Sequence, residues 1–422
     1  MRKITAGDVL HVYGSLGRIA YSVRLCIRMD ELIDADILAR ALKKTSKRYP
    51  YLCVALKAEN EEYFFDENNE PVCLFNTDER ITLNSAETNY HVWAVCYKDD
   101  FIYLDFYHGI CDGTGIYFVL ATLLYYYESE KYGPISSEGI RTLDDPIDEK
   151  EFLDPMDLLP EIDLSTLPQG ISQRKPSFSL LDDAGMTPSS AAIVRDVMIP
   201  EKELLKFTSA NDASPGTFIT VITARAIDKI NPVREKPLMG AYIINGRPML
   251  HAPLSHHNCV TTTSMEYTDK LKNMPLDKQC TAYRGRTFLQ SDEESVQRLL
   301  TFSSSRCKMV AKSPTLEAKK AAYAQMMEGG KKYFSYMVSY VGQWKQKEIG
   351  AHIKEFWTHV PDANGFLIEV AAVNGNIFLS MQQNFVEDTY YKAFLAELEA
   401  NNIPYTEVAT MENDIAYFPE IK

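Results

Sequence analysis

A histidine and an aspartate four residues apart are the residues of this chain whose types and spacing could do chemistry. Residues 107–113 read Tyr-His-Gly-Ile-Cys-Asp-Gly, so His108, Asp112 and Gly113 form the pattern His-x-x-x-Asp-Gly. A neutral imidazole has a pKa of about 6.5 and can take a proton from a substrate near neutral pH. His108 is therefore a candidate general base, and Asp112 could point back into the protein and fix the loop.

The same residues fit three other interpretations. Asp112 could act only as the N-cap of a following helix, with His108 a structural residue at a strand end. His108, Cys111 and Asp112 could bind a metal, but three ligands within five residues make a cramped site with no fourth ligand nearby, so we expect no metal. A nucleophilic Cys111 with His108 as its base is disfavoured, because adjacent positions in a tight turn seldom give the required geometry.

A second pair of histidines, His256-His257, does not repeat the pattern. Asn258-Cys259-Val260-Thr261 follows, without an Asp-Gly at the necessary offset. We interpret this segment as a polar loop. The sequence also contains no glycine-rich phosphate loop of the G-x-G-x-x-G or Walker A type.

The motif must be positioned by a strand before it and a helix after it. Apolar residues alternate along 101–107, which predicts a strand, and 91–96 predicts the other strand of a hairpin. Apolar and aromatic residues crowd 114–129, which predicts a core helix. Upstream, 35–48 predicts a second helix with one buried stripe. We therefore expect the strand-to-helix turn to bring His108 to an opening.

In this context, the motif at 107–113 resembles the signature of the condensation-domain and chloramphenicol-acetyltransferase-like acyltransferases. Among these, the chain is most similar to the alcohol acetyltransferase branch. That signature is His-x-x-x-Asp-Gly, often with another histidine in front, where this chain has Tyr107. The helix at 35–48, followed by Pro50 and Leu52, also resembles the opening of that superfamily. The resemblance implies an α/β protein of two domains, two sandwiches that form a V with a central channel and His108 midway.

The resemblance also implies roles for the residues of the motif. His108 would be the general base that takes the proton from an alcohol or amine as this group attacks a thioester carbonyl. Asp112 would be structural and would orient the motif loop, with Gly113 in support. Its partner would be Arg247, which with Asn245 matches the superfamily's Asn-x-Arg element.

A second stretch, Ser339-Tyr340-Val341-Gly342, resembles the superfamily's Ser-Asn-Leu-Gly strand end near the active-site channel. Tyr340 departs from the usual asparagine. Ser339 could donate a hydrogen bond to the tetrahedral oxyanion, with Gly342 beside the channel. The alternative is an ordinary strand end with a turn glycine.

The composition excludes several classes of protein. Lys and Arg number 44 against 58 Asp and Glu, and a net charge of -14 argues against a nucleic-acid binder. The eight cysteines are scattered without a C-x-x-C pair or zinc spacing, which is typical of a reduced, cytoplasmic protein. The first residues lack the apolar region of a signal peptide, and no apolar run is long enough to span a bilayer.

The length of 422 residues predicts two domains rather than one core. Between 133 and 190 prolines recur among acidic and serine residues, which predicts a linker or a segment that crosses the surface. We place an N-terminal half with the motif at 1–165, the linker at 166–190 and a C-terminal half at 191–422.

We expect this protein to transfer an acyl group from a CoA thioester to a small-molecule alcohol or amine. The acyl group that we expect is acetyl. Acyl-CoA would be a co-substrate, with no bound cofactor and no metal. Two alternatives remain open. One is a condensation or polyketide-associated acyltransferase whose donor is an acyl carrier protein, and the other is a non-catalytic binding protein of the same fold.

Overall fold

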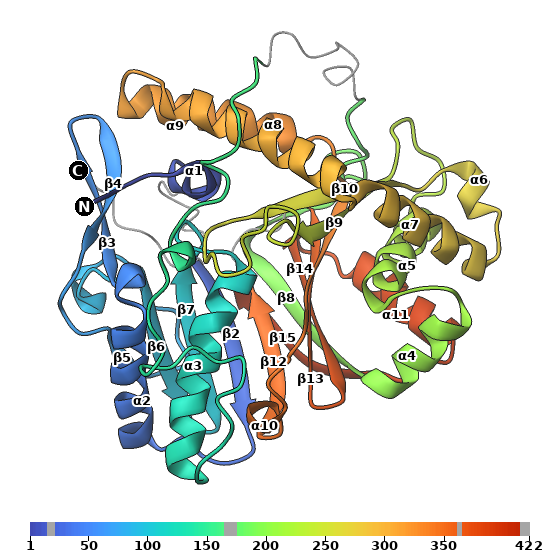
Figure 1. Ribbon diagram of the computed structural model, residues 1–422. Coiled ribbons are helices and arrows are strands. Elements are labelled where there is room, and N and C mark those ends of the chain that lie inside the picture. Colours follow the sequence, from blue (N-terminus) through green and yellow to red (C-terminus); the bar gives the residue numbers. More distant parts are fainter. Residues whose placement is uncertain (15–21, 164–174, 361–364, 414–422) are drawn as a thin grey trace.

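The computed structural model describes residues 1–14, 22–163, 175–360 and 365–413, and it consists of two halves that are each built on a β-sheet (Figure 1). No described helix is long and apolar enough to cross a membrane.

The first sheet carries the His-x-x-x-Asp-Gly motif. In spatial order it contains β12 (Ile353–His359), β2 (Ser22–Met29), β7 (Phe101–Tyr107), β6 (Trp93–Lys98) and β5 (Leu74–Asn76). Helices α2 (Ala35–Arg48) and α3 (Gly113–Lys131) cover one face of it (Figure 1). A small sheet of β1 (Arg2–Lys3), β4 (Glu62–Glu67) and β3 (Val54–Glu59) lies beside it. The motif follows β7 directly and opens α3.

The second sheet has seven strands. Their spatial order is β10 (Val260–Glu266), β9 (Met239–Asn245), β11 (Tyr336–Gln343), β13 (Phe366–Val373), β14 (Asn376–Phe385), β8 (Pro188–Pro200) and β15 (Thr406–Asn413). The helices on its outer side are α4 (Glu201–Ala210), α5 (Pro215–Ile230), α7 (Leu276–Gln290) and α11 (Thr389–Ala400) (Figure 1). Short α6 (Asp269–Lys272) precedes α7.

Two long helices return from the second half to the first. α8 (Glu293–Ala311) and α9 (Leu316–Lys331) run above α1 (Ala6–Val12) in Figure 1. Tyr323 of α9 donates a hydrogen bond from its hydroxyl to the carbonyl oxygen of Leu10 at 2.8 Å, and Lys319 forms an ion pair with Glu62 of β4. The helices therefore tie the second half to the N-terminus.

β12 also crosses from one half to the other. It follows α10 (Lys347–Gly350), pairs antiparallel with β2, and leads back to β13 in the second sheet. His359 at its end lies 3.0 Å, from Nε2 to Oδ2, from Asp196 on β8. Residues within 191–422 thus complete the first sheet. The division at 165 and 191 stays a prediction, and residues 166–174 of the expected linker lie outside the described residues.

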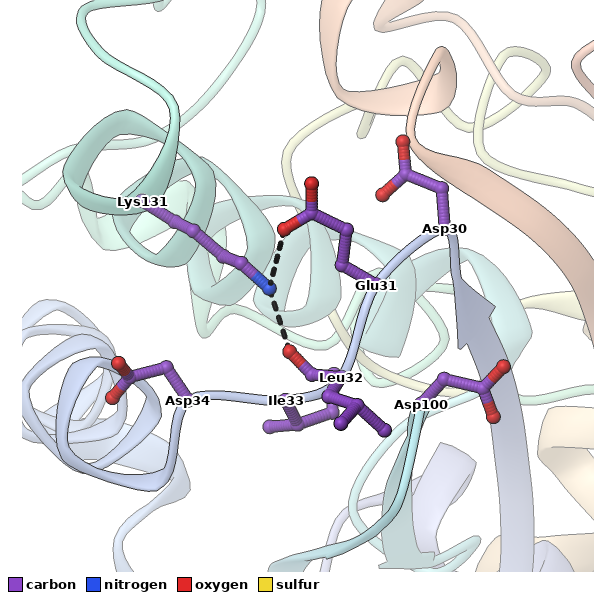
Figure 2. A pocket seen from close by; sticks show the side chains of 7 residues that line it. All are labelled: Asp30, Glu31, Leu32, Ile33, Asp34, Asp100 and Lys131. Carbon is purple, nitrogen blue, oxygen red and sulfur yellow. Dashed lines mark hydrogen bonds and ion pairs between the residues drawn. The ribbon is translucent and has the colours of Figure 1, made fainter.

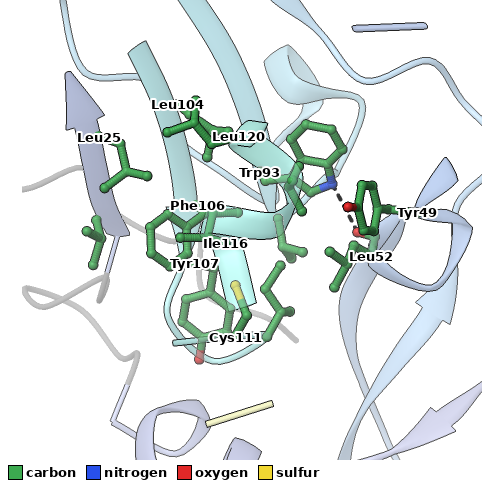
Figure 3. Close-up of a cluster of buried hydrophobic side chains, with 14 of the residues drawn as sticks. Leu25, Tyr49, Leu52, Trp93, Leu104, Phe106, Tyr107, Cys111, Ile116 and Leu120 are labelled. Carbon is green, nitrogen blue, oxygen red and sulfur yellow. Dashed lines mark hydrogen bonds between the residues drawn. The ribbon is translucent and has the colours of Figure 1, made fainter. Parts of the chain in front are cut away.

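A dense apolar core holds the motif from behind. Figure 3 shows Phe106, Tyr107, Cys111 and Ile116 packed together, so β7, the turn and the start of α3 share one cluster. Trp93 lies at its edge and donates from Nε1 to the carbonyl oxygen of Leu52 at 3.1 Å. These side chains are at most 1% exposed. The packing fixes the turn, because any shift of these buried side chains would open gaps in a closely packed core.

The expected elements around the motif are confirmed. The strand at 101–107 is β7, the core helix at 114–129 lies within α3, and the helix at 35–48 is α2, which Asp34 caps through the N–H of Ile37 at 3.0 Å.

The surface segment expected between 133 and 190 differs in one respect. The described residues of this segment have little regular structure apart from the short helix η3 (Glu149–Glu151) and the start of β8, but the segment enters the protein interior, where Glu151 and Asp154 are each 3% exposed. Glu151 binds Arg48 through two hydrogen bonds of 2.7 and 3.0 Å. This ion pair is buried, so the segment leaves the surface where it forms the pair.

Candidate active site

Asp112 fixes the turn that carries His108. Its carboxylate accepts a hydrogen bond from the backbone N–H of Gly115 at 3.0 Å and so caps α3. Arg247 donates to both carboxylate oxygens, from Nη2 at 2.7 Å and from Nη1 at 2.8 Å. The backbone N–H of Cys259 adds a bond of 3.1 Å. The side chains of this ion pair are only 2% and 3% exposed, so the pair joins the two halves from inside.

Arg247 is in turn held by its surroundings. The side-chain oxygen of Asn245 accepts a hydrogen bond from the backbone N–H of Arg247 at 3.0 Å, and the guanidinium donates to the carbonyl oxygens of Ser255 and His257, both at 2.7 Å. Burial lowers the pKa of Arg247, but the Asp112 carboxylate outweighs this effect and the net pKa is raised. The structure thus brings Asn245, Arg247 and Asp112 together as the resemblance implies.

The segment interpreted as a polar loop is a loop only up to Cys259, because Val260 and Thr261 begin β10, and the loop part is buried. His256 is 2% exposed, and His257 and Asn258 are 0% exposed. His256 Nδ1 lies 2.7 Å from the carbonyl oxygen of Glu151, while the amide of Asn258 donates to the carbonyl oxygen of His108 at 2.8 Å. The loop therefore packs against the motif. Its burial depends on contact between the two halves, which the local sequence does not reveal.

His108 lies beside a second imidazole. The ring centroids of His108 and His11 of α1 are 4.0 Å apart, and the ring planes are stacked. Burial lowers the pKa of His108 below its ordinary 6.5, although Asp112 and Asn258 act in the opposite direction. An imidazole with a lowered pKa is neutral at pH 7 and is able to accept a proton.

A cavity of about 110 Å³ between the two sheets reaches His108. One wall comes from β2, β7 and α3, and the other comes from β9, β11 and β13, with β12 between them. Of the residues expected at the site, those that border the cavity are His108, Asp112, Gly113, Asn245 and Ser339. The cavity places the imidazole of the first half opposite side chains of the second half.

Gly342 does not border this cavity. It has a φ of 114°, and the register between β11 and β13 shifts between Tyr340 and Gly342. A positive φ favours glycine, since it has no Cβ. Gly342 therefore shapes the bulge at the end of β11, next to the strand segment that presents Ser339.

The described residues contain no group of three or more His, Cys, Asp or Glu side chains that could hold a metal ion. Cys111 is 0% exposed, and burial raises the pKa of its thiol well above the ordinary value. A thiol in that state is not a nucleophile at neutral pH, which disfavours the pair of Cys111 and His108 as a nucleophile and its base.

A larger hollow of about 630 Å³ has no residue of the motif in its lining. Figure 2 shows the side chains that line it. Its side chains include the carboxylates of Asp30, Glu31, Asp34 and Asp100. The one cation in its lining, Lys131, is already bound to Glu31 and to the carbonyl oxygen of Leu32. Like charges repel, so this hollow is unsuited to the phosphates of an acyl-CoA.

Sequence reasoning missed several residues of the cavity. Glu369 of β13, Thr358 of β12 and Tyr117 of α3 all border it. Glu369 had a detectable signal, because it is the single charged residue in the apolar run 366–373. Tyr117 and Thr358 had none, since the pattern of a helix or strand does not tell which face meets a cavity.

Solved structures with the same overall arrangement are known. The structure of F. graminearum TRI101 complexed with coenzyme A and T-2 mycotoxin is 12% identical, with a TM-score of 0.65 over 97% of this chain and 99% of that chain. The polyketide synthase associated protein 5 from Mycobacterium tuberculosis is 11% identical, with a TM-score of 0.62 over 94% of this chain and 97% of that chain. No protein-family model matches the sequence, and no curated protein matches it.

A third structure is the first condensation domain of the calcium-dependent antibiotic synthetase. It is 14% identical, with a TM-score of 0.59 over 97% of this chain and 99% of that chain. The chain therefore has the two-domain α/β fold that CoA acyltransferases and condensation domains share, as the resemblance in the sequence implied.

Proposed function

We propose that this protein transfers an acyl group from acyl-CoA to the hydroxyl group of a small molecule, with His108 as the general base. The observation that carries the proposal is the position of His108, a neutral imidazole that borders the cavity between the two halves. Its loop is fixed by the buried pair of Asp112 and Arg247. A fixed base of this kind is what deprotonation of an alcohol requires.

The reaction follows from this geometry. A ring nitrogen of His108 takes the hydroxyl proton while the acceptor oxygen bonds to the thioester carbon. The resulting oxyanion needs a hydrogen-bond donor, and the Ser339 hydroxyl on the opposite wall is the candidate. When the carbon–sulfur bond breaks, the thiolate of CoA takes the proton from His108. No covalent acyl-enzyme and no metal take part.

Two further observations support this proposal. A chain of the same fold is complexed with coenzyme A and with a small molecule, T-2 mycotoxin, which fits acyl-CoA as the co-substrate here. All eight cysteines are free thiols, a state typical of the reducing cytoplasm, where we place the reaction. Acetyl is the first acyl group to test, and amines are the second class of acceptor.

One alternative donor is also favoured by an observation. Structures of this fold include a polyketide synthase associated protein and a condensation domain of an antibiotic synthetase. A carrier-protein thioester would bring the same carbonyl to His108. The two donors differ in what must dock outside the cavity, so an assay with acetyl-CoA and an acetylated carrier protein separates them.

The experiment is thiol release from acetyl-CoA with a panel of small alcohols and amines. The parent is compared with His108→Ala and with a control, His251→Ala, which removes a histidine whose side chain is 78% exposed. Release that requires an acceptor, persists in the control and is lost in His108→Ala supports the proposal. Undiminished release by His108→Ala would overturn it.

A further inference from the structure

One carboxyl group of the cavity has no partner of opposite charge among the residues that the structure describes. Glu369 lies on β13, directly opposite Ser339 of the parallel strand β11 and Ser380 of the antiparallel strand β14. Its side chain borders the same cavity of about 110 Å³ as His108. The carboxyl therefore faces the position where an acceptor would approach the base.

No ion pair satisfies this carboxyl within the described residues. The lining of the cavity contains no lysine or arginine, and the charge of Asp112 is already taken by Arg247. Burial raises the pKa of Glu369 to about 7, although the Ser339 hydroxyl opposes this through a hydrogen bond. A carboxyl enclosed by protein without a cation is costly, and such groups occur mostly where a ligand uses them.

A comparison within the same sheet makes this point stronger. Asp196 of β8 lies in the same cross-strand row, beyond Ser380, and it is paired with His359 at 3.0 Å. That pair has no need of a ligand, because the protein supplies both charges. Glu369 differs in lacking the second charge and in bordering the cavity.

The remaining walls suit an organic cation. Aromatic rings of Phe106, Tyr117 and Tyr340 border the cavity together with Glu369. Aromatic faces and one carboxylate are the surroundings in which proteins bind ammonium groups. The other polar side chains of the lining include Asn245, Ser339 and Thr358, which are neutral, so Glu369 is the carboxyl group there that can bind a cation without displacing an ion pair.

We propose that Glu369 binds an ammonium group of the acceptor, so that the substrate is a small amino alcohol whose hydroxyl group is turned toward His108. This inference rests on the proposed acyl transfer, which it narrows to one class of acceptor. The distance between the hydroxyl and the ammonium group would be set by the span of the cavity between β7 and β13.

The first test compares aminopropanol with butanol, which has the same number of heavy atoms but no charge, and with propanediol, which can donate hydrogen bonds but is neutral. The quantity measured is kcat/KM for thiol release from acetyl-CoA at neutral pH. We expect the parent to favour aminopropanol over butanol at least tenfold, and Glu369→Gln to lose that preference. A control, Glu355→Gln on β12, removes a glutamate that is paired with Arg28 and does not border the cavity, and it should keep the parent's ratio.

The possible outcomes distinguish the ammonium site from acyl transfer itself. A parent that favours butanol or propanediol, or a Glu369→Gln variant that slows all three acceptors equally, would overturn the ammonium site while acyl transfer stands. As a test that needs no variant, ethylammonium should inhibit the parent in competition with the acceptor, and absence of inhibition also overturns the site.

Failure of acyl transfer itself gives a different result. In that case the parent releases no thiol with any acceptor. Calorimetric titration of the parent and of the two glutamate variants with ethylammonium then tests the ammonium site independently of acyl transfer. Binding that Glu355→Gln keeps and Glu369→Gln loses would support it, and equal binding or no binding by all three would overturn it.

Discussion

The side-chain amide of Asn258 donates a hydrogen bond to the backbone carbonyl oxygen of His108, with 2.8 Å between nitrogen and oxygen. Asn258 belongs to the second half of the chain and is 0% exposed, while His108 belongs to the first half. Together with the ion pair of Asp112 and Arg247, this bond fixes both ends of the turn from the other half. The position of the proposed base therefore depends on contact between the halves.

The first prediction concerns Asn258→Ala. Loss of the amide should leave the turn folded but less well positioned, and kcat should fall about tenfold to a hundredfold. Asn258 also raises the pKa of His108. The pH at which kcat/KM reaches half of its maximum should therefore shift downward in the variant. The pH profile is the decisive measurement, since a simple loss of stability would leave that midpoint unchanged.

A second prediction concerns the pair itself. Asp112→Ala and Arg247→Ala each leave a buried charge without its partner, which costs about 3–5 kcal/mol of unfolding free energy. Urea unfolding measures this loss. As a control, Lys392→Ala removes a cation from a pair whose side chains are 70% and 42% exposed, and it should change stability little. Parent-like unfolding of Asp112→Ala or of Arg247→Ala would contradict the role of the pair.

The immediate surroundings of the motif could be predicted from the sequence because they are local. The alternation of apolar residues predicts the strand β7, and the dense apolar stretch after it predicts the helix α3. Their order in the chain predicts the turn between them. The Asp112–Arg247 pair joins positions 135 residues apart. It could be proposed only because both residues match motifs of a known superfamily, and spacing alone would not have connected them.

The rest depends on packing that no local pattern encodes. β12 joins the first sheet by pairing with β2, more than 300 residues earlier in the chain. Glu369 stands out in an apolar strand, but its direction is decided by the pairing of β13 with β11 and β14. The segment 276–331 received no prediction, although it forms three helices, α7, α8 and α9. α9 is rich in Ala and Lys and shows no strong apolar stripe.

A third prediction follows from His359, which joins the two sheets through Asp196. Burial lowers the pKa of His359, but Cys26 and Asp196 outweigh it and raise the pKa from 6.5 to about 10. The folded state therefore holds this proton more tightly than the unfolded state does. The stabilisation is complete below pH 6.5 and is lost as the pH rises toward 10.

The measurement is unfolding free energy from urea titrations at several pH values in that window. His359→Asn should be less stable than the parent at pH 6.5, and the difference should shrink as the pH rises to about 10. A matched control is His352→Asn, which removes a partly exposed histidine that pairs with Asp30 near the same strand. A difference that stays constant with pH for His359→Asn would show that the imidazole is not charged in the folded protein.

The last prediction concerns Glu128, which is 0% exposed in α3 and whose carboxyl oxygens have no hydrogen-bond partner within the described residues. Burial, with a smaller contribution from Asp30, raises the pKa of Glu128 from 4.5 to about 9. Between these values the folded state binds a proton that the unfolded state releases, so the stability of the parent falls as the pH rises.

Glu128→Gln keeps the shape of the side chain and removes the titration. The variant should therefore be more stable than the parent above pH 4.5, by an amount that grows until about pH 9. From pH 7 to pH 9 this gain should increase by about 2 kcal/mol. Glu130→Gln, two residues along the same helix, removes a glutamate that pairs with Arg40 at the surface, and it should show no such gain. A Glu128→Gln variant that gains no stability as the pH rises would mean that the carboxyl reaches water, because only a buried group must give up its charge.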